Sequence, residues 1–171
     1  MKITILKQIL TTLLMLLLAS NVFAEPTLQY DVELHATSSG TYTLSANITP
    51  SLEAEFLFDT GASMVMIGKK LFKQISKFQK PISNGKIMAR MASGSMKTIP
   101  TYILPSLVLA NGCDVGPVEI AVVNGATRNL IGLNALTKLG QITIDIQKVK
   151  LVTTKCPHIF LGNPQITAVK N

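Results

Sequence analysis

Short stretches in which apolar and polar residues alternate run through most of this chain, and they constrain its fold more than any other feature. In residues 42–48, for example, Tyr42, Leu44, Ala46 and Ile48 alternate with polar residues. This is the period of a half-buried strand. We therefore expect strands over residues 28–34, 42–48, 54–58, 86–103 (a hairpin with its tip at 93–95), 141–146 and 148–153, and a hairpin that joins 107–110 to 118–122 through Asn111-Gly112.

Two segments have a helical period instead. Apolar residues in 69–78 recur with the spacing of one helix face, and the segment ends shortly before Pro81. Residues 134–139 predict one or two helical turns that end at Gly140, and the tail, 154–171, is predicted to be irregular. The expected fold class is all-β with one or two short helices, and closed barrels and double-layer antiparallel folds are both compatible with it.

The first 24 residues have the pattern of a secretory signal peptide. Lys2 and Lys7 precede an apolar stretch over 9–19, and Val22-Phe23-Ala24 is a small-x-small cleavage site. The apolar stretch is about half the ~20 residues that a membrane-spanning helix needs. We expect an exported protein of the bacterial periplasm with one domain over 25–171. The alternative is an uncleaved segment that anchors the chain in the inner membrane.

The chain contains two cysteines, Cys113 and Cys156. An even pair in an exported protein predicts a disulfide, and two buried free thiols are the alternative. A metal site built from these cysteines and His158 would lack one ligand and have poor spacing, so no metal is expected.

The basic residues are unevenly distributed. Residues 25–171 contain 14 Lys and Arg and nine Asp and Glu, a net charge of +5. Eight of the 14 cations lie from Lys69 to Lys97, and no acidic residue lies between Asp59 and Asp114. Such a region predicts a weak contact with an anionic membrane surface or an acidic protein, and a solvated face is the alternative. Nucleic acid is not an expected partner, because no aromatic residues interleave with these lysines.

Residues 56–63, Phe-Leu-Phe-Asp-Thr-Gly-Ala-Ser, are the most informative segment. An apolar strand delivers the carboxylate of Asp59 to a tight turn. Thr60 offers a hydroxyl group to tie the turn, and Gly61 permits close approach of the backbone. The carboxylate is the candidate catalytic group.

This segment resembles the Asp-Thr-Gly-Ala-Ser loop of aspartic proteases, specifically the single-lobed retropepsin-like family of retroviruses and bacteria. Ala92, Ser93 and Gly94 stand where that family has its flap, although bacterial relatives often have a Thr-Ala-Asn-Gly-like stretch there. Leu130, Ile131 and Gly132 resemble the second apolar-apolar-Gly element, which a short helix follows. The resemblance covers roughly residues 42–152.

The resemblance implies a closed β-barrel of short antiparallel strands and an aspartic endopeptidase that needs no cofactor. Two aspartates share a proton and activate one water in this family. Asp31, Asp114 and Asp145 have no Thr-Gly context, so the second carboxylate is expected from Asp59 of a symmetry mate in a homodimer. Thr60, Gly61, Ala62 and Ser63 are implied as support for the active-site loop, and a peptide or protein is the implied substrate.

Other interpretations remain open. The same fold could serve as a catalytically inactive binding or scaffold protein of the periplasm, or Asp59 could be an ordinary turn residue. A Ser–His hydrolase built on Ser63 is disfavoured, because His35 and His158 are distant in sequence and lie in ordinary contexts. The methionines between residues 64 and 96 either line a peptide cleft or fill gaps in a core that is poor in aromatic residues.

Overall fold

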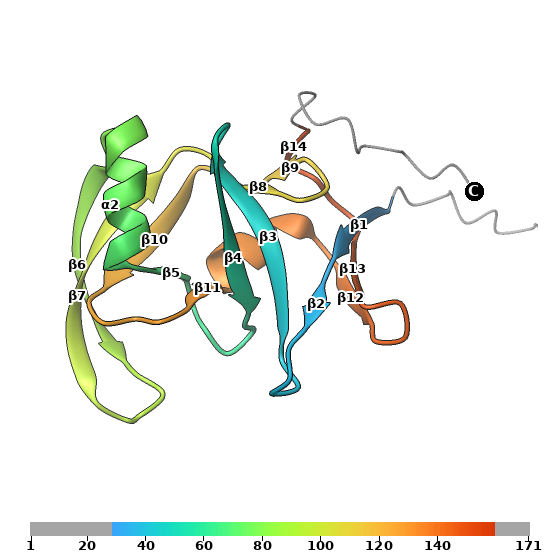
Figure 1. Cartoon of the computed structure of the whole chain (residues 1–171), viewed down its shortest axis with the longest axis horizontal. Helices are drawn as coiled ribbons and strands as arrows, with labels where there is room; N and C mark the ends of the chain where they lie inside the picture. The colour runs from blue at the N-terminus through green and yellow to red at the C-terminus, as the bar shows by residue number, and fades with distance from the viewer. Residues whose placement is uncertain (1–28, 160–171) are drawn as a thin grey trace, which may run out of the picture.

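The computed structural model describes residues 29–159, and these form an all-β fold with short helices (Figure 1), which confirms the predicted class. The predicted signal peptide, Leu28 and residues 160–171 of the tail lie outside the described part. The elements, in chain order, are β1 (Tyr30–Glu33), β2 (His35–Ala36), β3 (Tyr42–Thr49), β4 (Leu52–Phe58), β5 (Val65–Gly68), α2 (Lys69–Phe78), β6 (Ile82–Arg90), β7 (Met96–Leu104), β8 (Val108–Leu109), β9 (Cys113–Asp114), β10 (Val118–Val123), β11 (Asn129–Ile131), α3 (Leu133–Leu136), the 3-10 helix η1 (Thr137–Leu139), β12 (Ile142–Asp145), β13 (Lys150–Thr153) and β14 (His158–Ile159).

The strands form an 11-stranded sheet and a 3-stranded sheet in the order β1-β13-β12. Among the described residues, the hydrogen-bonded path of the large sheet runs from β14 to β6 without returning to its start, so these strands are not joined into a ring. The prediction of antiparallel strands alone needs a correction, because β11 pairs with β4 and β10 pairs with β5 in parallel. Parallel neighbours need long connections, which local alternation does not reveal.

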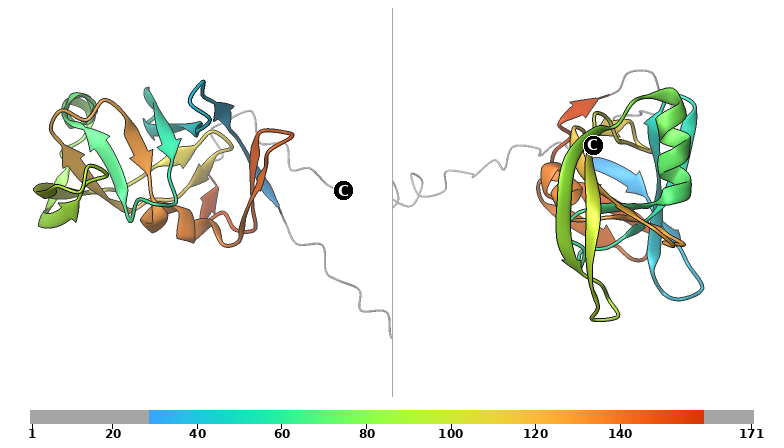
Figure 2. Two further views of the ribbon diagram at one scale, coloured as in Figure 1. Left: turned by 90° about the horizontal axis from the view of Figure 1, so that it is seen from below. Right: turned by 90° about the vertical axis from the view of Figure 1, so that its left-hand side faces the viewer.

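Helix α2 has the bounds that its 3.6-residue period predicts. Leu71 and Ile75 are buried, while the lysines of the helix are exposed. The ring of Phe72 packs against Tyr102 of β7, with ring centroids 4.4 Å apart. The helix covers the sheet near β6, β7 and β10 in Figures 1 and 2. Its amphipathic sequence therefore leaves one face on the core and the basic face in water.

Two local expectations were wrong or incomplete. Residues 107–110 do not pair with 118–122, because Val108 of β8 lies opposite Asp114 of β9 and β10 pairs with β7 and β5 instead. The carboxylate of Asp114 accepts hydrogen bonds from the backbone N–H groups of Leu107 and Gly116 at 2.9 and 2.8 Å. These bonds fix a turn directly after Asp114, so β9 ends after two residues. Strand β5 was missed because its four residues do not alternate, and β14 forms inside the tail predicted to be irregular.

Aliphatic side chains fill the main core, as the shortage of aromatic residues requires. The largest fully buried side chains are Phe56, Leu44, Ile67, Ile75, Leu104, Leu107, Leu109, Ile120, Ile131, Leu136, Leu139 and Leu151. A second, smaller cluster, of Ile99 on β7 with Ala121 and Val123 on β10, lies on one face of the β6–β7 hairpin. Three methionines, Met64, Met66 and Met91, pack against this cluster, whereas Met88 and Met96 are exposed.

Cys113 and Cys156 form the predicted disulfide. Their Cα atoms lie 5.4 Å apart, within the range that a disulfide spans, and they are separated by 43 residues in sequence. Cys113 is buried in the main core, and β14, which follows Cys156, pairs with β9. The bridge therefore ties the end of the domain to the β8–β9 hairpin.

Replacing both cysteines by alanine is expected to lower the free energy of unfolding by about 3–4 kcal/mol, because the unfolded chain loses a 43-residue cross-linked loop. Thermal melting of the double variant and of the reduced parent should show a similar loss of stability. Activity per folded molecule should hold, since neither cysteine hydrogen-bonds to the Asp59 loop. An unchanged melting temperature would contradict this account of the bridge.

Candidate active site

Asp59 stands at the end of β4, in the middle of the large sheet. Strand β4 pairs with β3 on one side and with β11 on the other, where Phe58 lies opposite Ile131. The backbone N–H of Asp59 donates to the carbonyl oxygen of Ile131 at 3.2 Å. The carboxylate thus leaves the sheet where two strands with buried side chains end together, and it is half-buried.

A tight turn holds one oxygen of this carboxylate. The backbone N–H of Gly61 donates to Oδ1 of Asp59 at 2.8 Å, and that of Ala62 donates to the Asp59 carbonyl oxygen at 3.3 Å. A Cβ atom at residue 61 would lie 3.1 Å from Oδ1, so a larger residue there would crowd the carboxylate and glycine does not. Among the described residues, no group donates to Oδ2, which leaves this oxygen free for a water or a substrate.

The first residues of α3 hydrogen-bond to the Asp59 loop. The backbone N–H groups of Leu133 and Asn134 donate to the carbonyl oxygens of Ala62 and Ser63 at 2.9 and 3.1 Å. The side chain of Asn134 accepts from the backbone N–H of Val65 at 2.9 Å and donates to the carbonyl oxygen of Glu119 at 2.7 Å. Backbone groups thereby join the loop to the helix, and the side chain of Asn134 joins both to the sheet.

A second asparagine joins the strands on either side of the loop. Asn129 accepts from the backbone N–H of Gly68 on β5 at 3.1 Å and donates to the carbonyl oxygen of Glu55 on β4 at 3.1 Å. The sequence analysis did not identify the roles of Asn129 and Asn134. The available signal was an amide side chain on each side of the Leu130-Ile131-Gly132 element.

Gly132 lies directly beneath the Asp59 loop. A Cβ atom at this residue would meet the carbonyl oxygen of Met64 and would lie 2.7 Å from that of Ala62. Only glycine allows β11 and α3 to approach the loop so closely. The structure therefore brings the second apolar-apolar-Gly element together with the Asp-Thr-Gly turn, as the resemblance implies.

The predicted flap residues form the tip of the β6–β7 hairpin. Ala92, Ser93 and Gly94 are exposed, and Gly94 has φ +80°, as its place in a tight turn requires. The backbone N–H of Met91 donates to the Ser95 carbonyl oxygen, and that of Gly94 to the Met91 carbonyl oxygen, both at 2.8 Å. The hairpin tip and the Asp59 loop both lie along the lower edge of the molecule in Figure 1.

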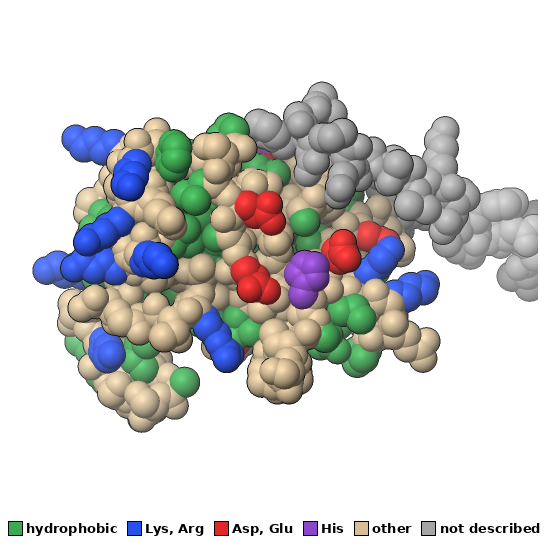
Figure 3. Space-filling model, in the orientation of Figure 1, with side chains coloured by type: hydrophobic (Ala, Val, Ile, Leu, Met, Phe, Trp, Pro, Cys, Tyr) green, Lys and Arg blue, Asp and Glu red, His purple; other side chains and the backbone are tan. Residues whose placement is uncertain are grey.

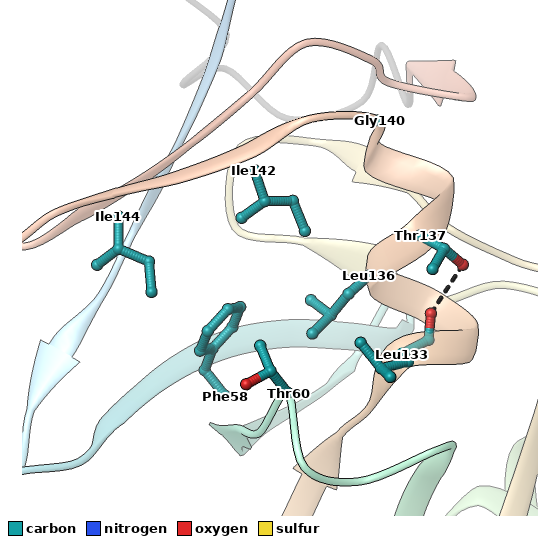
Figure 4. Close-up of a pocket in the computed structure, with 8 residues that line it drawn as sticks. All are labelled: Phe58, Thr60, Leu133, Leu136, Thr137, Gly140, Ile142 and Ile144. Carbon is teal, nitrogen blue, oxygen red and sulfur yellow. Dashed lines mark hydrogen bonds between the residues drawn. The ribbon is translucent and has the colours of Figure 1, made fainter.

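An apolar hollow of about 360 Å³ opens beside the loop (Figure 4). Its lining comes from β4, the Asp59 loop, α3, η1 and β12, and consists of Phe58, Thr60, Leu133, Leu136, Thr137, Gly140, Ile142 and Ile144. The Thr137 hydroxyl donates to the Leu133 carbonyl oxygen at 2.8 Å and so turns away from the hollow. Leu133 and Ile144 of this lining are exposed, so large apolar side chains face solvent beside the Asp59 loop.

The other three described aspartates have structural partners elsewhere. Asp31 pairs with Lys150 at 3.2 Å, and Asp114 holds the β8–β9 hairpin. The backbone N–H of Lys148 chiefly, with its ammonium group and the N–H of Gln147, holds the pKa of Asp145 below its ordinary value. None of them hydrogen-bonds to the Asp59 loop within residues 29–159.

Neither a serine–histidine pair nor a metal centre is present in the described part of the chain. His35 lies on β2 and His158 on β14, and neither hydrogen-bonds to Ser63. No group of three or more His, Cys, Asp or Glu side chains between residues 29 and 159 is arranged to hold a metal ion. Over the same residues, no helix has the length and apolar character to cross a membrane.

Comparisons with known proteins agree with this geometry. A family model described as "gag-polyprotein putative aspartyl protease" matches residues 45–138, more than half of the chain. The solved structure of a retropepsin-like aspartic protease from Rickettsia conorii is similar, with a TM-score of 0.51 and 17% identity over 73% of this chain and 88% of that one. No curated protein matches. The chain therefore belongs to the retropepsin-like aspartic protease family.

Proposed function

We propose that the protein is an aspartic endopeptidase whose active site forms in a homodimer. The observation that carries this proposal is the turn at Asp59, which keeps one carboxylate oxygen fixed by Gly61 N–H while the other is free. Family membership supports the same reaction. Peptides or proteins are the proposed substrates.

The proposed reaction uses two copies of Asp59 and one water. One ionised carboxylate takes a proton from the water, whose oxygen attacks the carbonyl carbon of the scissile bond. The other carboxyl group is protonated and donates a hydrogen bond to the carbonyl oxygen. Gly61 and α3 would hold each carboxylate in the orientation that this exchange of protons needs.

The surface around Asp59 supports a dimer. A two-fold mate that brings its own Asp59 into contact must cover the neighbouring surface, where the apolar hollow and exposed Leu133 and Ile144 lie. Strand β12 is also an edge of its sheet, with β13 on one side only. A dimer that buries this surface would remove apolar area from water, and it would also bring the second Asp59 carboxylate to the site.

The proposed function is tested by incubating the protein with a peptide library between about pH 3 and pH 8, with and without a pepstatin-type inhibitor. We expect inhibitor-sensitive cleavage with a bell-shaped, acidic pH profile. Two carboxylates in contact do not ionise together easily, and the singly protonated pair is the active form. A rate that keeps rising through about pH 9 would point to another base. Peptide binding without cleavage would support the scaffold alternative.

Ile144→Asp is expected to convert the dimer to a monomer and to abolish activity, because it places a charge in the proposed interface beside Thr60. Sedimentation and activity should be measured over the same dilution series. Ile82→Asp is the matched control, since Ile82 is 61% exposed on β6 and should leave both unchanged. Parent activity that stays proportional to concentration through a monomer transition would refute the dimeric site.

We also propose that the protein works after export, in an oxidising compartment such as the periplasm. The signal-like pattern over residues 1–24 motivates this location, and the Cys113–Cys156 disulfide is consistent with it. N-terminal sequencing of the protein from a fractionated host tests both the compartment and the cleavage after Ala24. An uncut chain in the membrane fraction would favour the anchored alternative.

A further inference from the structure

The two faces of the β6–β7 hairpin have different roles. Ile87, Ala89 and Met91 share one face and pack against the cluster of Ile99, Ala121 and Val123. The alternate residues Lys86, Met88 and Arg90 therefore share the opposite face, across from Pro100, Thr98 and Met96. Met88 and Met96 are 72% and 55% exposed, so the second face combines cations with apolar side chains in water.

Helix α2 extends this face. Thr98 and Pro100 of β7 line a hollow together with Lys69 and Phe72 of α2, which places the helix on the same side of the hairpin. We call this surface the α2 face. Its exposed cations are Lys69, Lys70, Lys73, Lys77, Lys80, Lys86 and Arg90, and its exposed large apolar residues are Phe78, Met88 and Met96.

The charge of the α2 face is of one sign. No acidic residue occurs from residue 60 to residue 113, and neither of the two ion pairs found within residues 29–159 involves these cations. Figure 3 shows Lys and Arg side chains gathered over α2 and the hairpin, while the acidic side chains in that view lie over the middle and right of the molecule. A field of this kind attracts an extended anionic surface.

The hollow in the α2 face has about 400 Å³ of space and an apolar lining under basic groups. Phe72, Pro100 and Tyr102 form much of its wall, and Lys69 also lines it. An acidic protein would pair with the lysines but would leave the exposed apolar side chains of Phe78, Met88 and Met96 without a function. A phospholipid offers both chemistries, since its phosphate matches the ammonium groups and its acyl chains match the apolar residues.

We propose that the α2 face docks the protein on a bilayer that contains anionic phospholipid, with Met88, Met96 and Phe78 entering the headgroup region between the lysines. This docking is independent of peptidase activity, because it uses the hairpin face turned away from the second core cluster. Docking would need neither Asp59 nor the partner copy.

The absence of tryptophan from the chain allows a local test. Met88→Trp introduces a single reporter at an exposed position, and Met96→Trp is a second reporter in case the first variant does not fold. Ile159→Trp, on β14, is the matched control outside the α2 face. The full chain of each variant is mixed with vesicles of equal phosphatidylglycerol and phosphatidylcholine, and with vesicles of phosphatidylcholine alone.

We expect the emission of the Met88 or Met96 reporter to shift to shorter wavelength, and to be quenched by brominated acyl chains, with the phosphatidylglycerol vesicles only. The Ile159 reporter should stay in water. Because all variants contain the N-terminal segment, its own membrane affinity does not produce this difference. A shift of the Ile159 reporter equal to the others, or no shift of either hairpin reporter, would overturn the proposal.

Charge reversal then tests the lysines. Lys73→Glu with Lys86→Glu in the Met88→Trp chain should weaken vesicle binding at least about ten-fold, since each basic residue near an anionic surface adds to the attraction and each glutamate opposes it. Lys148→Glu with Lys155→Glu is the matched control and should change it little. Equal effects of the two pairs would overturn the proposal, and so would tight binding of poly-glutamate together with no preference for phosphatidylglycerol vesicles.

Discussion

Asp59→Asn is expected to lower the rate of peptide cleavage at least about 10²-fold and to leave the fold intact. The asparagine carbonyl oxygen can still accept the hydrogen bond that Gly61 N–H donates to Oδ1. The variant cannot, however, take a proton from water or share one with its symmetry mate. Cleavage rates, circular dichroism and the melting temperature should be measured on the same preparation.

Asp31→Asn is the matched control for this substitution. Asp31 is an exposed aspartate on β1 whose partner is Lys150, so its amide variant should lose an exposed ion pair and keep full activity. Cleavage retained by a clean preparation of Asp59→Asn would remove Asp59 from the proposed mechanism. A parent protein that never cleaves, with both variants identical to it, would favour a binding role for the fold.

Gly132→Ala is expected to destabilise the protein by about 2–3 kcal/mol and to inactivate the molecules that still fold. The new methyl group would meet the backbone of Met64 and Ala62, with 2.7 Å to the Ala62 carbonyl oxygen. These backbone atoms cannot rotate away from the methyl group as a side chain could, so the Asp59 loop must shift. The shift would stretch the hydrogen bond from Leu133 N–H to Ala62 and misplace Asp59.

Gly116→Ala separates lost stability from lost activity. Its Cβ atom would meet the backbone of Pro105 and Ser106 just as closely, at the β8–β9 hairpin and not at the Asp59 loop. We expect a comparable fall in the urea midpoint, but normal activity per folded molecule below the transition. If Gly132→Ala also keeps normal activity when folded, the close approach at Gly132 has no role in positioning the carboxylate.

Features with a strong local signal were predictable from the sequence. Helix α2 spans residues 69–78 as predicted because its apolar residues repeat with the helical period. Strands β3 and β4 follow their alternation, and Asp59 ends β4 as its apolar run suggests. The Cys113–Cys156 bridge followed from an even number of cysteines and an expected export signal.

Features that depend on distant contacts were not predictable in this way. The amide of Asn134 meets Val65 across 69 residues, and that of Asn129 meets Gly68 across 61 residues. The hairpin at Asn111-Gly112 has a good turn signal, yet the carboxylate of Asp114 ends it before β10 begins. The period of apolar residues in a segment identifies a helix or a strand, whereas the strand with which it pairs depends on the packing of the whole sheet.

The disulfide also encloses much of the support for the Asp59 loop in one covalent ring. Elements β10, β11, α3, β12 and β13 all lie between Cys113 and Cys156, whereas Asp59 lies outside. A proteolytic nick in the exposed β12–β13 turn, at Ile146 to Lys148, would leave the two fragments linked. A self-digesting preparation would then run as one band without reductant and as two bands with it, and β13 would stay attached to the fragment that contains Asp59 and α3.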